Sequence, residues 1–160
     1  MISIIAAVGK NRELGKKGGL CFKIPGDLKF FKNTTMGFPV FMGLNTWKSL
    51  PGKLPGRKHY VLSFKKDEDL PEDVELVNDL DSFLTTWQKS EDKLFVIGGA
   101  SVYKQALPYC NEMYLTEVDG EDKNADVFFP EFDKTAWDKK VVGEGEDDGL
   151  KYTHVLYTRK

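Results

Sequence analysis

An almost unbroken apolar run at residues 2–8, ISIIAAV, is the feature that most constrains the fold. A strand with one face in water alternates polar and apolar residues, whereas a strand covered on both faces is apolar throughout. Residues 2–8 therefore predict a strand inside a sheet, with helices packed on both faces. Comparable runs predict further strands at residues 38–43, 59–63, 93–97 and 113–118, with a shorter one at 74–77 towards an edge.

Helical patterns lie between these strands. Pro25 suits the first turn of a helix, where its missing N–H is not needed, and this helix should end near residues 34–37. Asn45 is expected to cap a short helix over residues 45–50. Two further helices are predicted at residues 80–88, from the spacing of apolar side chains, and at residues 100–107, before Pro108.

The last part of the chain predicts a hairpin. Its strands are expected at residues 137–142 and 152–157, joined across residues 143–149. Strands that alternate with helices and then close in a hairpin are typical of an α/β fold. We expect one domain over residues 1–160, with a central, mainly parallel, twisted sheet of about eight strands, an antiparallel C-terminal hairpin and helices on both faces.

Charge and cysteine content argue against several classes of protein. The formal net charge is −2 and the basic residues are scattered, so a nucleic acid is not an expected partner. No apolar segment is long enough to span a membrane, and the N-terminal run lacks the basic start of a secretory signal. Cys21 and Cys110 lack zinc-site spacing, and neither His59 nor His154 lies in a metal-binding motif. We expect free thiols in a cytoplasmic protein that binds no metal.

Ligands of open α/β sheets bind where strands end and helices begin. Gly98 and Gly99 follow a predicted strand, and without Cβ atoms their backbone N–H groups can approach an anion closely. A tight turn without a ligand is the alternative. Gly43 precedes a second helix start, and two such junctions would suit the pyrophosphate of a dinucleotide. No GxSxG elbow, HExxH motif or Walker sequence is present.

Asp27 falls on the apolar side of its predicted helix, with Leu28, Phe30 and Phe31, while Lys29 and Lys32 face the other way. A buried carboxylate is costly unless it is hydrogen-bonded, paired or protonated. Asp27 is therefore a candidate acid or ligand anchor. The alternative is an ordinary aspartate at a helix start, favoured by the helix dipole and still in water.

Two loops carry further candidates. Residues 9–19 are polar and rich in glycine, which predicts a long mobile loop of the kind that is usually functional. Arg57 lies on a loop with two Pro-Gly pairs, where its guanidinium could bind a substrate carboxylate. A solvated surface arginine is the alternative.

Several short runs also occur in a distinctive order and spacing. They are ISIIAA at residues 2–7, Arg12 with Leu14-Gly15, PGDL at 25–28 with Phe31-Lys32, PVFMG at 39–43 with Thr46-Trp47, LPGR at 54–57, VIGG at 96–99 with Val102-Tyr103, YLT at 114–116 and Phe129-Pro130. Over nearly the whole chain this pattern resembles bacterial dihydrofolate reductase. The resemblance implies an oxidoreductase that reduces 7,8-dihydrofolate to tetrahydrofolate with hydride from NADPH, in support of one-carbon and thymidylate metabolism.

The resemblance assigns roles around the substrate. Asp27 would bind the amide and amino groups of the pterin and favour protonation of its imine nitrogen, with water as the proton carrier. Thr116 would orient the carboxylate, and Phe22 would join them as a catalytic residue. Arg57 would take the α-carboxylate of the glutamate tail. The remaining substrate-binding residues implied are Ile5, Ala6, Leu20, Leu28, Phe31, Leu50, Leu54 and Ile97.

NADPH is the implied cofactor, and residues 9–23 would form a lid over its nicotinamide. The peptide bond between Gly98 and Gly99 is expected to be cis. A monomer is expected, and antifolates are plausible inhibitors. The implied cofactor-binding residues are Ala7, Leu14, Gly15, Gly43, Leu44, Asn45, Thr46, Ser49, Leu62, Ser63, Phe64, Ile97, Gly98, Gly99, Ala100, Ser101, Val102 and Tyr103.

The chain departs from the family pattern at two places. Many relatives have Pro-Trp where this chain has Cys21-Phe22, and phenylalanine lacks the indole N–H that can hold a water near the carboxylate. Many bacterial members have Arg-His where this chain has Leu44-Asn45, and those basic side chains bind the 2′-phosphate of the cofactor. We hypothesise that Lys65 and Lys66 supply the missing charge.

Two other functions compete with this interpretation. A pyrimidine reductase of riboflavin synthesis shares the sheet and the cofactor site, but it would not be expected to pair Asp27 with Arg57. A non-catalytic nucleotide-binding module is the second alternative, although such a module would have no need for Asp27, Thr116 and Arg57 together.

Overall fold

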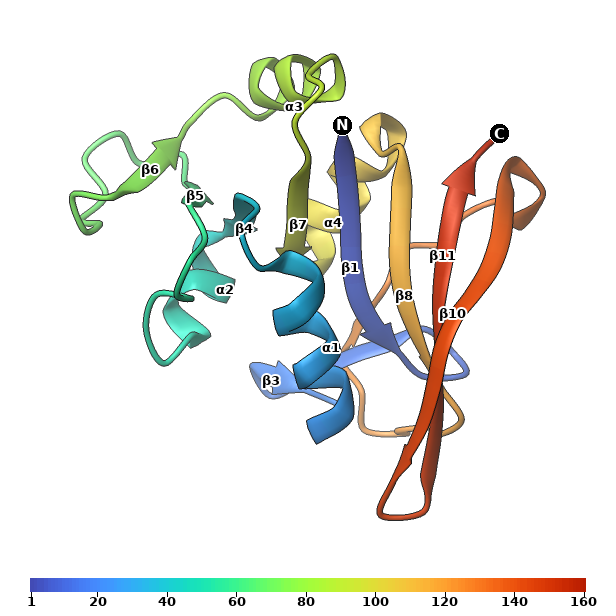
Figure 1. Cartoon of the computed structure of the whole chain (residues 1–160). Coiled ribbons are helices and arrows are strands. Elements are labelled where there is room, and N and C mark those ends of the chain that lie inside the picture. The colour runs from blue at the N-terminus through green and yellow to red at the C-terminus, as the bar shows by residue number, and fades with distance from the viewer.

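A computed structural model describes residues 1–160. Its main sheet has eight strands in the order β10-β11-β8-β1-β7-β4-β5-β6, so the N-terminal strand lies in the interior of the sheet (Figure 1). The pairings of β8, β1, β7, β4, β5 and β6 are parallel, whereas β11 is antiparallel to both β8 and β10. The bounds are β1 Ile2–Val8, β4 Val40–Gly43, β5 His59–Leu62, β6 Val74–Val77, β7 Leu94–Gly98, β8 Glu112–Val118, β10 Trp137–Asp147 and β11 Leu150–Arg159.

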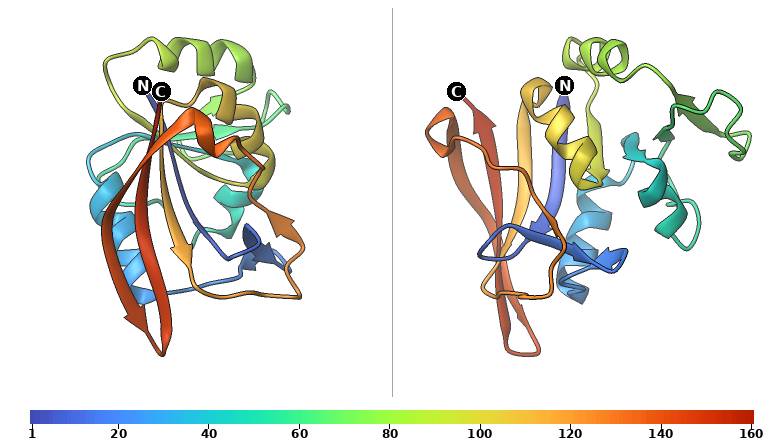
Figure 2. Two further views of the ribbon diagram at one scale, coloured as in Figure 1. Left: turned by 90° about the vertical axis from the view of Figure 1, so that its right-hand side faces the viewer. Right: turned by 180° about the vertical axis from the view of Figure 1, so that it is seen from behind.

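Helices cover both faces of the sheet, as the sequence predicts. Helix α1 lies in front of the strands in Figure 1 and α4 behind them, and the reverse view in Figure 2 brings α4 to the front. The helices are α1 Pro25–Thr35, α2 Leu44–Ser49, α3 Leu80–Gln88 and α4 Ala100–Ala106, with short 3-10 turns η1 Leu107–Tyr109 and η2 Lys134–Ala136.

The two faces carry separate apolar cores, because alternate residues of each strand point to opposite sides. On the α1 face, Ile5, Met42 and Phe95 are buried against side chains of α1 and α2. On the other face, Ile2 and Ile4 belong to a larger cluster that includes side chains of α3 and α4. The strand β1 contributes to both cores, which confirms that its apolar run is buried from two sides.

A small second sheet corrects the prediction of a loop over residues 9–19. The strands β2 Glu13–Lys16 and β3 Gly19–Leu20 pair with each other, and β2 also pairs with β9 Val127–Phe128. The polar, glycine-rich sequence gives no strand signal, because the pairing partner comes from more than 100 residues further along the chain. Backbone pairing with that distant segment stabilises the strand instead.

Several element boundaries also differ from the predictions, and three of the differences have a clear cause. Asn45 does not cap α2: the helix begins at Leu44, and Gly43, still paired with β5, is the capping residue. Residues 143–147 continue β10, so the connection shrinks to the Asp148-Gly149 turn that such a dipeptide favours. Helix α4 ends at Ala106, one residue before its predicted end, and a 3-10 turn containing Pro108 follows.

None of the helices has both the length and the apolar character that crossing a membrane requires. Cys21 and Cys110 are both free thiols.

Candidate active site

Asp27 and Thr116 meet on the α1 face of the sheet. Asp27 lies in the first turn of α1, which starts at Pro25 after an extended Ile24, and Thr116 lies on β8. The Thr116 hydroxyl donates a hydrogen bond of 2.5 Å to Asp27 Oδ1. Only 16% of the Asp27 side chain is exposed, so the carboxylate is neither at the surface nor without a partner. The structure favours the candidate acid over an ordinary solvated helix start.

Burial raises the pKa of Asp27 above its ordinary value, and the hydrogen bond from Thr116 and the nearby His154 oppose that rise. Desolvation disfavours the charged form of a carboxylate, so Asp27 keeps its proton to a higher pH than an exposed aspartate does. Asp27 Oδ2 accepts no hydrogen bond from the protein, which leaves that oxygen for a ligand.

His154 is a member of this cluster that the sequence interpretation missed. Its Nδ1 lies 2.8 Å from Thr116 Oγ1 and 3.8 Å from Asp27 Oδ1, and its ring stacks on Phe30 with 3.8 Å between centroids. Burial lowers the pKa of His154, and the Asp27 carboxylate opposes this. The signal for this contact is the antiparallel register of β8 and β11, which sets His154 opposite Thr116. That register cannot be derived from the local sequence.

Several predicted substrate residues share one apolar cluster. Ile5 is buried there, and Phe31, Leu50 and Ile97 pack against the same core. The Ala6 side chain points the other way and packs against the opposite core. Leu20 on β3 and Leu28 on α1 are half-exposed, and the backbone N–H of Leu54 donates to His59 Nε2.

Arg57 is fixed against the end of α1. Its Nη1 donates to Thr35 Oγ1 and its Nε donates to the carbonyl oxygen of Pro55, each at 3.0 Å. Thr35 is fully buried in the last turn of the helix. Asp27 and Arg57 therefore lie near opposite ends of α1, roughly 12 Å apart along the axis at the rise of an α-helix.

The glycine pair comes close to helix α2. The Gly98–Gly99 peptide bond is cis, as expected, and Gly98 has a φ of 145°. A Cβ built on Gly98 would lie 3.1 Å from Thr46 Oγ1, and one built on Gly43 would lie 3.2 Å from Val102 Cγ2. The ends of β4 and β7 thus form a cradle of bare backbone at the starts of α2 and α4.

Other predicted cofactor residues lie around this cradle in different settings. Tyr103 is buried and its hydroxyl donates to the Ile5 carbonyl oxygen at 2.8 Å, which ties α4 to β1. Leu62 and Ser63 are buried at the end of β5, next to an exposed Phe64. Asn45, Ser49 and Ser101 are exposed on α2 and α4, whereas Leu44, Thr46 and Ala100 are partly buried.

The predicted lid is attached to the segment that follows β8. Gly15 accepts a backbone hydrogen bond from Asp126, and the N–H of Lys17 donates to the Asp126 carboxylate. Leu14 is buried beside them. Phe22 packs with Leu150 against a small cluster of Ile24, Val118 and Tyr152.

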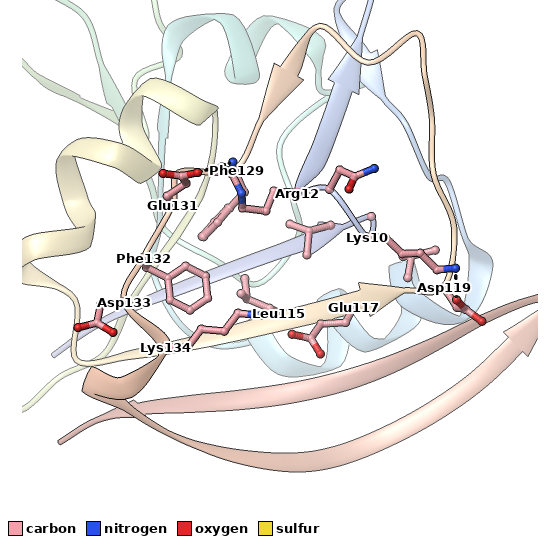
Figure 3. Close-up of a pocket in the computed structure, with 14 residues that line it drawn as sticks. Lys10, Arg12, Leu115, Glu117, Asp119, Phe129, Glu131, Phe132, Asp133 and Lys134 are labelled. Carbon is pink, nitrogen blue, oxygen red and sulfur yellow. Dashed lines mark hydrogen bonds and ion pairs between the residues drawn. The ribbon is translucent and has the colours of Figure 1, made fainter.

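A separate hollow of about 970 Å³ lies on the other side of the sheet (Figure 3). Leu115 and Glu117 line it, and they flank Thr116 on β8 but point to the opposite face. Its remaining walls come from the loop after β1 and from residues 129–134. This hollow is distinct from the Asp27 site.

Comparisons with known proteins agree with this fold. A family model of dihydrofolate reductase matches residues 1–159. The chain is 39% identical to dihydrofolate reductase of Neisseria gonorrhoeae over 162 residues, covering 99% of this chain and 98% of the relative. It is 37% identical over 165 residues to dihydrofolate reductase HdrB of Haloferax volcanii, covering 98% and 82% of the two chains.

A solved structure is also similar. Dihydrofolate reductase from Enterococcus faecalis, complexed with NADP(H) and RAB-propyl, superposes with a TM-score of 0.88 at 29% identity, over 100% of this chain and 96% of that one. An α/β protein with a cradle of bare backbone at two helix starts and a largely buried acid on the same sheet is the class that these features define. The chain belongs to the dihydrofolate reductase family. Its reaction is the NADPH-dependent reduction of dihydrofolate to tetrahydrofolate.

Proposed function

We propose that Asp27, oriented by Thr116, is the pterin-binding acid of this reduction. The observation that carries the proposal is the short hydrogen bond from Thr116 to a largely buried Asp27, which leaves Oδ2 without a protein partner. A carboxylate in this position can accept hydrogen bonds from an amide and an amino group at the edge of a flat ring.

The carboxylate of Asp27 helps the chemistry. Addition of hydride to the carbon of a C=N bond puts negative charge on the nitrogen, so protonation of that nitrogen speeds the step. An ionised Asp27 beside the ring favours the protonated form of the pterin. The structure has no second carboxylate hydrogen-bonded to Thr116 or Asp27, which supports water as the carrier of the proton.

Arg57 would bind the α-carboxylate at the other end of the substrate. Its guanidinium is held by Thr35 and Pro55 through Nη1 and Nε, and its remaining N–H groups are available for a carboxylate. The Asp27-to-Arg57 separation along α1 suits an elongated substrate with a ring at one end and an acid at the other. Ile5, Phe31 and Leu50 would contact its apolar middle.

The bare backbone cradle supports the binding of NADPH. Gly43 and Gly98 present bare backbone where a Cβ would crowd Val102 or Thr46, and Gly99 follows directly, which is the local shape that a pyrophosphate needs. Bound NADPH supplies the hydride. Leu14 and Gly15 lie on β2, which is held in place by its pairing with β9. This strand would exclude water from the nicotinamide side.

The direct test is a reductase assay with dihydrofolate and either NADPH or NADH, following the loss of nicotinamide absorbance. We expect turnover with NADPH and at least a tenfold lower kcat/KM with NADH. A protein that binds NADPH but never oxidises it in the presence of dihydrofolate would be a nucleotide-binding module, and the proposal would be wrong. Phe22, Leu20 and the other predicted contacts with side chains larger than alanine are tested afterwards by alanine substitution, and Ala6 is tested by Ala6→Gly.

We further propose that the protein is a monomer and that it lies in the cytoplasm. All the residues assigned to substrate and cofactor come from one chain, which supports activity as a monomer. The two free thiols are the state that a reducing compartment maintains, which supports a cytoplasmic location. Sedimentation of the purified protein tests the first proposal, and cell fractionation tests the second.

A further inference from the structure

The hydroxyl group of Thr116 is shared between two partners. Its oxygen lies 2.5 Å from Asp27 Oδ1 and 2.8 Å from His154 Nδ1, so one hydroxyl takes part in two short hydrogen bonds. A hydroxyl has one hydrogen and two lone pairs, and it can donate to only one of these partners. The other partner has to donate to the hydroxyl oxygen.

Two arrangements of the hydrogens satisfy both contacts and also give the Thr116 hydrogen an acceptor, because the hydroxyl has no other partner in the protein. If Asp27 Oδ1 is an acceptor, Thr116 donates to it, and His154 must carry a proton on Nδ1 and donate to Thr116. If His154 Nδ1 is bare, Thr116 donates to the ring, and Asp27 must carry a proton on Oδ1 itself. The tautomer of His154 and the position of the proton on Asp27 are therefore linked.

The surroundings of the ring favour the first arrangement. Phe30 stacks on the imidazole with an interplanar angle of 7°, and Gly143, opposite His154 on β10, has no side chain that could contact the ring, so the ring is held through Phe30. His154 Nε2 has no hydrogen-bond partner in the protein, whereas Nδ1 lies within hydrogen-bond distance of Thr116. A proton on Nδ1 gains the bond to Thr116.

Few titratable groups face His154. Helix α1 contributes Asp27, β11 itself contributes Tyr152 at 5.3 Å between ring centroids, and β10 contributes Asp147, whose carboxylate accepts from the Tyr152 hydroxyl at 3.5 Å. The neighbouring position on β8 is the uncharged Thr116. Asp27 is the one charge that acts on the imidazole, and it favours protonation of the ring.

We propose that His154 is a positioning residue for the reduction: it holds its proton on Nδ1 and donates to Thr116, which directs the single Thr116 hydrogen to Asp27 Oδ1. Any proton that Asp27 takes up is then placed on Oδ2, the oxygen that faces no protein partner. The inference rests on the proposed role of Asp27 in pterin binding, and it adds a residue that sets which carboxylate oxygen carries the proton.

This arrangement persists when His154 becomes charged, because the imidazolium also carries a proton on Nδ1. Each hydrogen bond in such a chain polarises the next, so the pair His154–Thr116 stabilises the ionised form of Asp27. Removing the Nδ1 donor should therefore raise the pKa of Asp27 further. A ring that only packs against Phe30 would have no such effect.

The first experiment uses the unaltered protein without ligand. Long-range ¹H–¹⁵N NMR spectra distinguish the two tautomers of His154, and we expect the proton on Nδ1 at neutral pH. A proton on Nε2 while Asp27 is ionised would overturn the proposal. This measurement needs no variant and no turnover, so it can succeed or fail independently of the proposed function.

The second experiment compares His154→Phe with His154→Asn. Phenylalanine keeps the stack on Phe30 and lacks the donor, whereas the asparagine amide places an N–H near the position of Nδ1. In ¹³C NMR titrations of the Asp27 carboxyl, we expect the apparent pKa to rise by about half a unit in His154→Phe and to return in His154→Asn. The pH at which kcat/KM for dihydrofolate falls should shift in the same way.

An unchanged Asp27 titration in folded His154→Phe would overturn the proposal, and so would equal shifts in both variants. If His154→Phe does not fold, the His154 tautomer measured in the unaltered protein decides whether the proposal is right. A protein with the expected tautomer and no reductase activity would refute the proposed function and leave the hydrogen-bond assignment standing.

Discussion

Thr116 Oγ1 lies 2.5 Å from Asp27 Oδ1, although 89 residues separate them in the chain. The contact joins the first turn of α1 to β8, which pairs with β1 in the interior of the sheet. A hydroxyl that donates to an ionised carboxylate forms one of the stronger hydrogen bonds in proteins. Because the helix and the strand are both packed on the same core, the orientation of the carboxylate is fixed before any ligand binds.

Replacing Asp27 with Asn should abolish most turnover near neutral pH. The amide keeps the shape of the side chain but cannot stabilise a protonated pterin, so we expect kcat/KM to fall by about 10² to 10⁴. The affinity for NADPH, measured by fluorescence titration, should stay the same. Loss mainly of NADPH affinity would contradict the assignment of Asp27 to the substrate.

The same substitution should stabilise the fold at neutral pH. Burial raises the pKa of Asp27 in the folded protein, so the ionised carboxylate at pH 7 opposes folding. Below the ordinary pKa of an aspartate, near 3.9, both folded and unfolded chains carry the proton and this cost is absent. We expect Asp27→Asn to raise Tm at pH 7 by about 2–4 °C, with a smaller gain as the pH falls. Asp138→Asn, at an exposed position on β10, is the control and should change Tm little.

Local sequence patterns predict much of the fold, and they single out Asp27 as a candidate site residue. The apolar run of β1, the Pro25 helix start and the spacing of α3 each depend on neighbours in sequence, and each is confirmed. The register of β8 against β11 and the pairing of β2 with β9 depend on distant segments. His154 was missed for that reason, and residues 9–19 were predicted as a loop.

Replacing Gly98 with Ala should damage both folding and cofactor binding. Its φ of 145° is strained for any residue with a Cβ, and the new methyl group would lie 3.1 Å from Thr46 Oγ1. We expect a loss of about 1–3 kcal/mol in the free energy of unfolding and a clear rise in the Kd for NADPH. Gly52→Ala is the control, because no atom lies within 4 Å of a Cβ there. Equal behaviour of the two variants in urea unfolding and NADPH titration would refute this role for Gly98.

Replacing Arg57 with Gln should weaken substrate binding with little effect on the cofactor. Loss of a charged, bidentate contact to a carboxylate is expected to raise KM for dihydrofolate about 10- to 100-fold. The Kd for NADPH should not change, because Arg57 contacts Thr35 and Pro55, away from the glycine cradle. A reduced pterin without the α-carboxylate serves as the control substrate. The parent and the variant should use it equally well, and an equal loss on both substrates would place Arg57 outside carboxylate recognition.

Replacing Lys65 and Lys66 with Ala should reduce the preference for NADPH over NADH. A 2′-phosphate beside the start of α2 would meet only the uncharged Leu44 and Asn45, whereas Lys65 and Lys66 are exposed shortly after the end of β5. An ammonium group near the phosphate favours NADPH alone, so the ratio of kcat/KM values for the two cofactors should fall about tenfold in the double variant. Lys140→Ala is the control, because it removes one lysine charge from an exposed position on β10, at the opposite edge of the sheet, and should leave the ratio unchanged. If the ratio is the same in the double variant and in the parent, these lysines do not bind the phosphate.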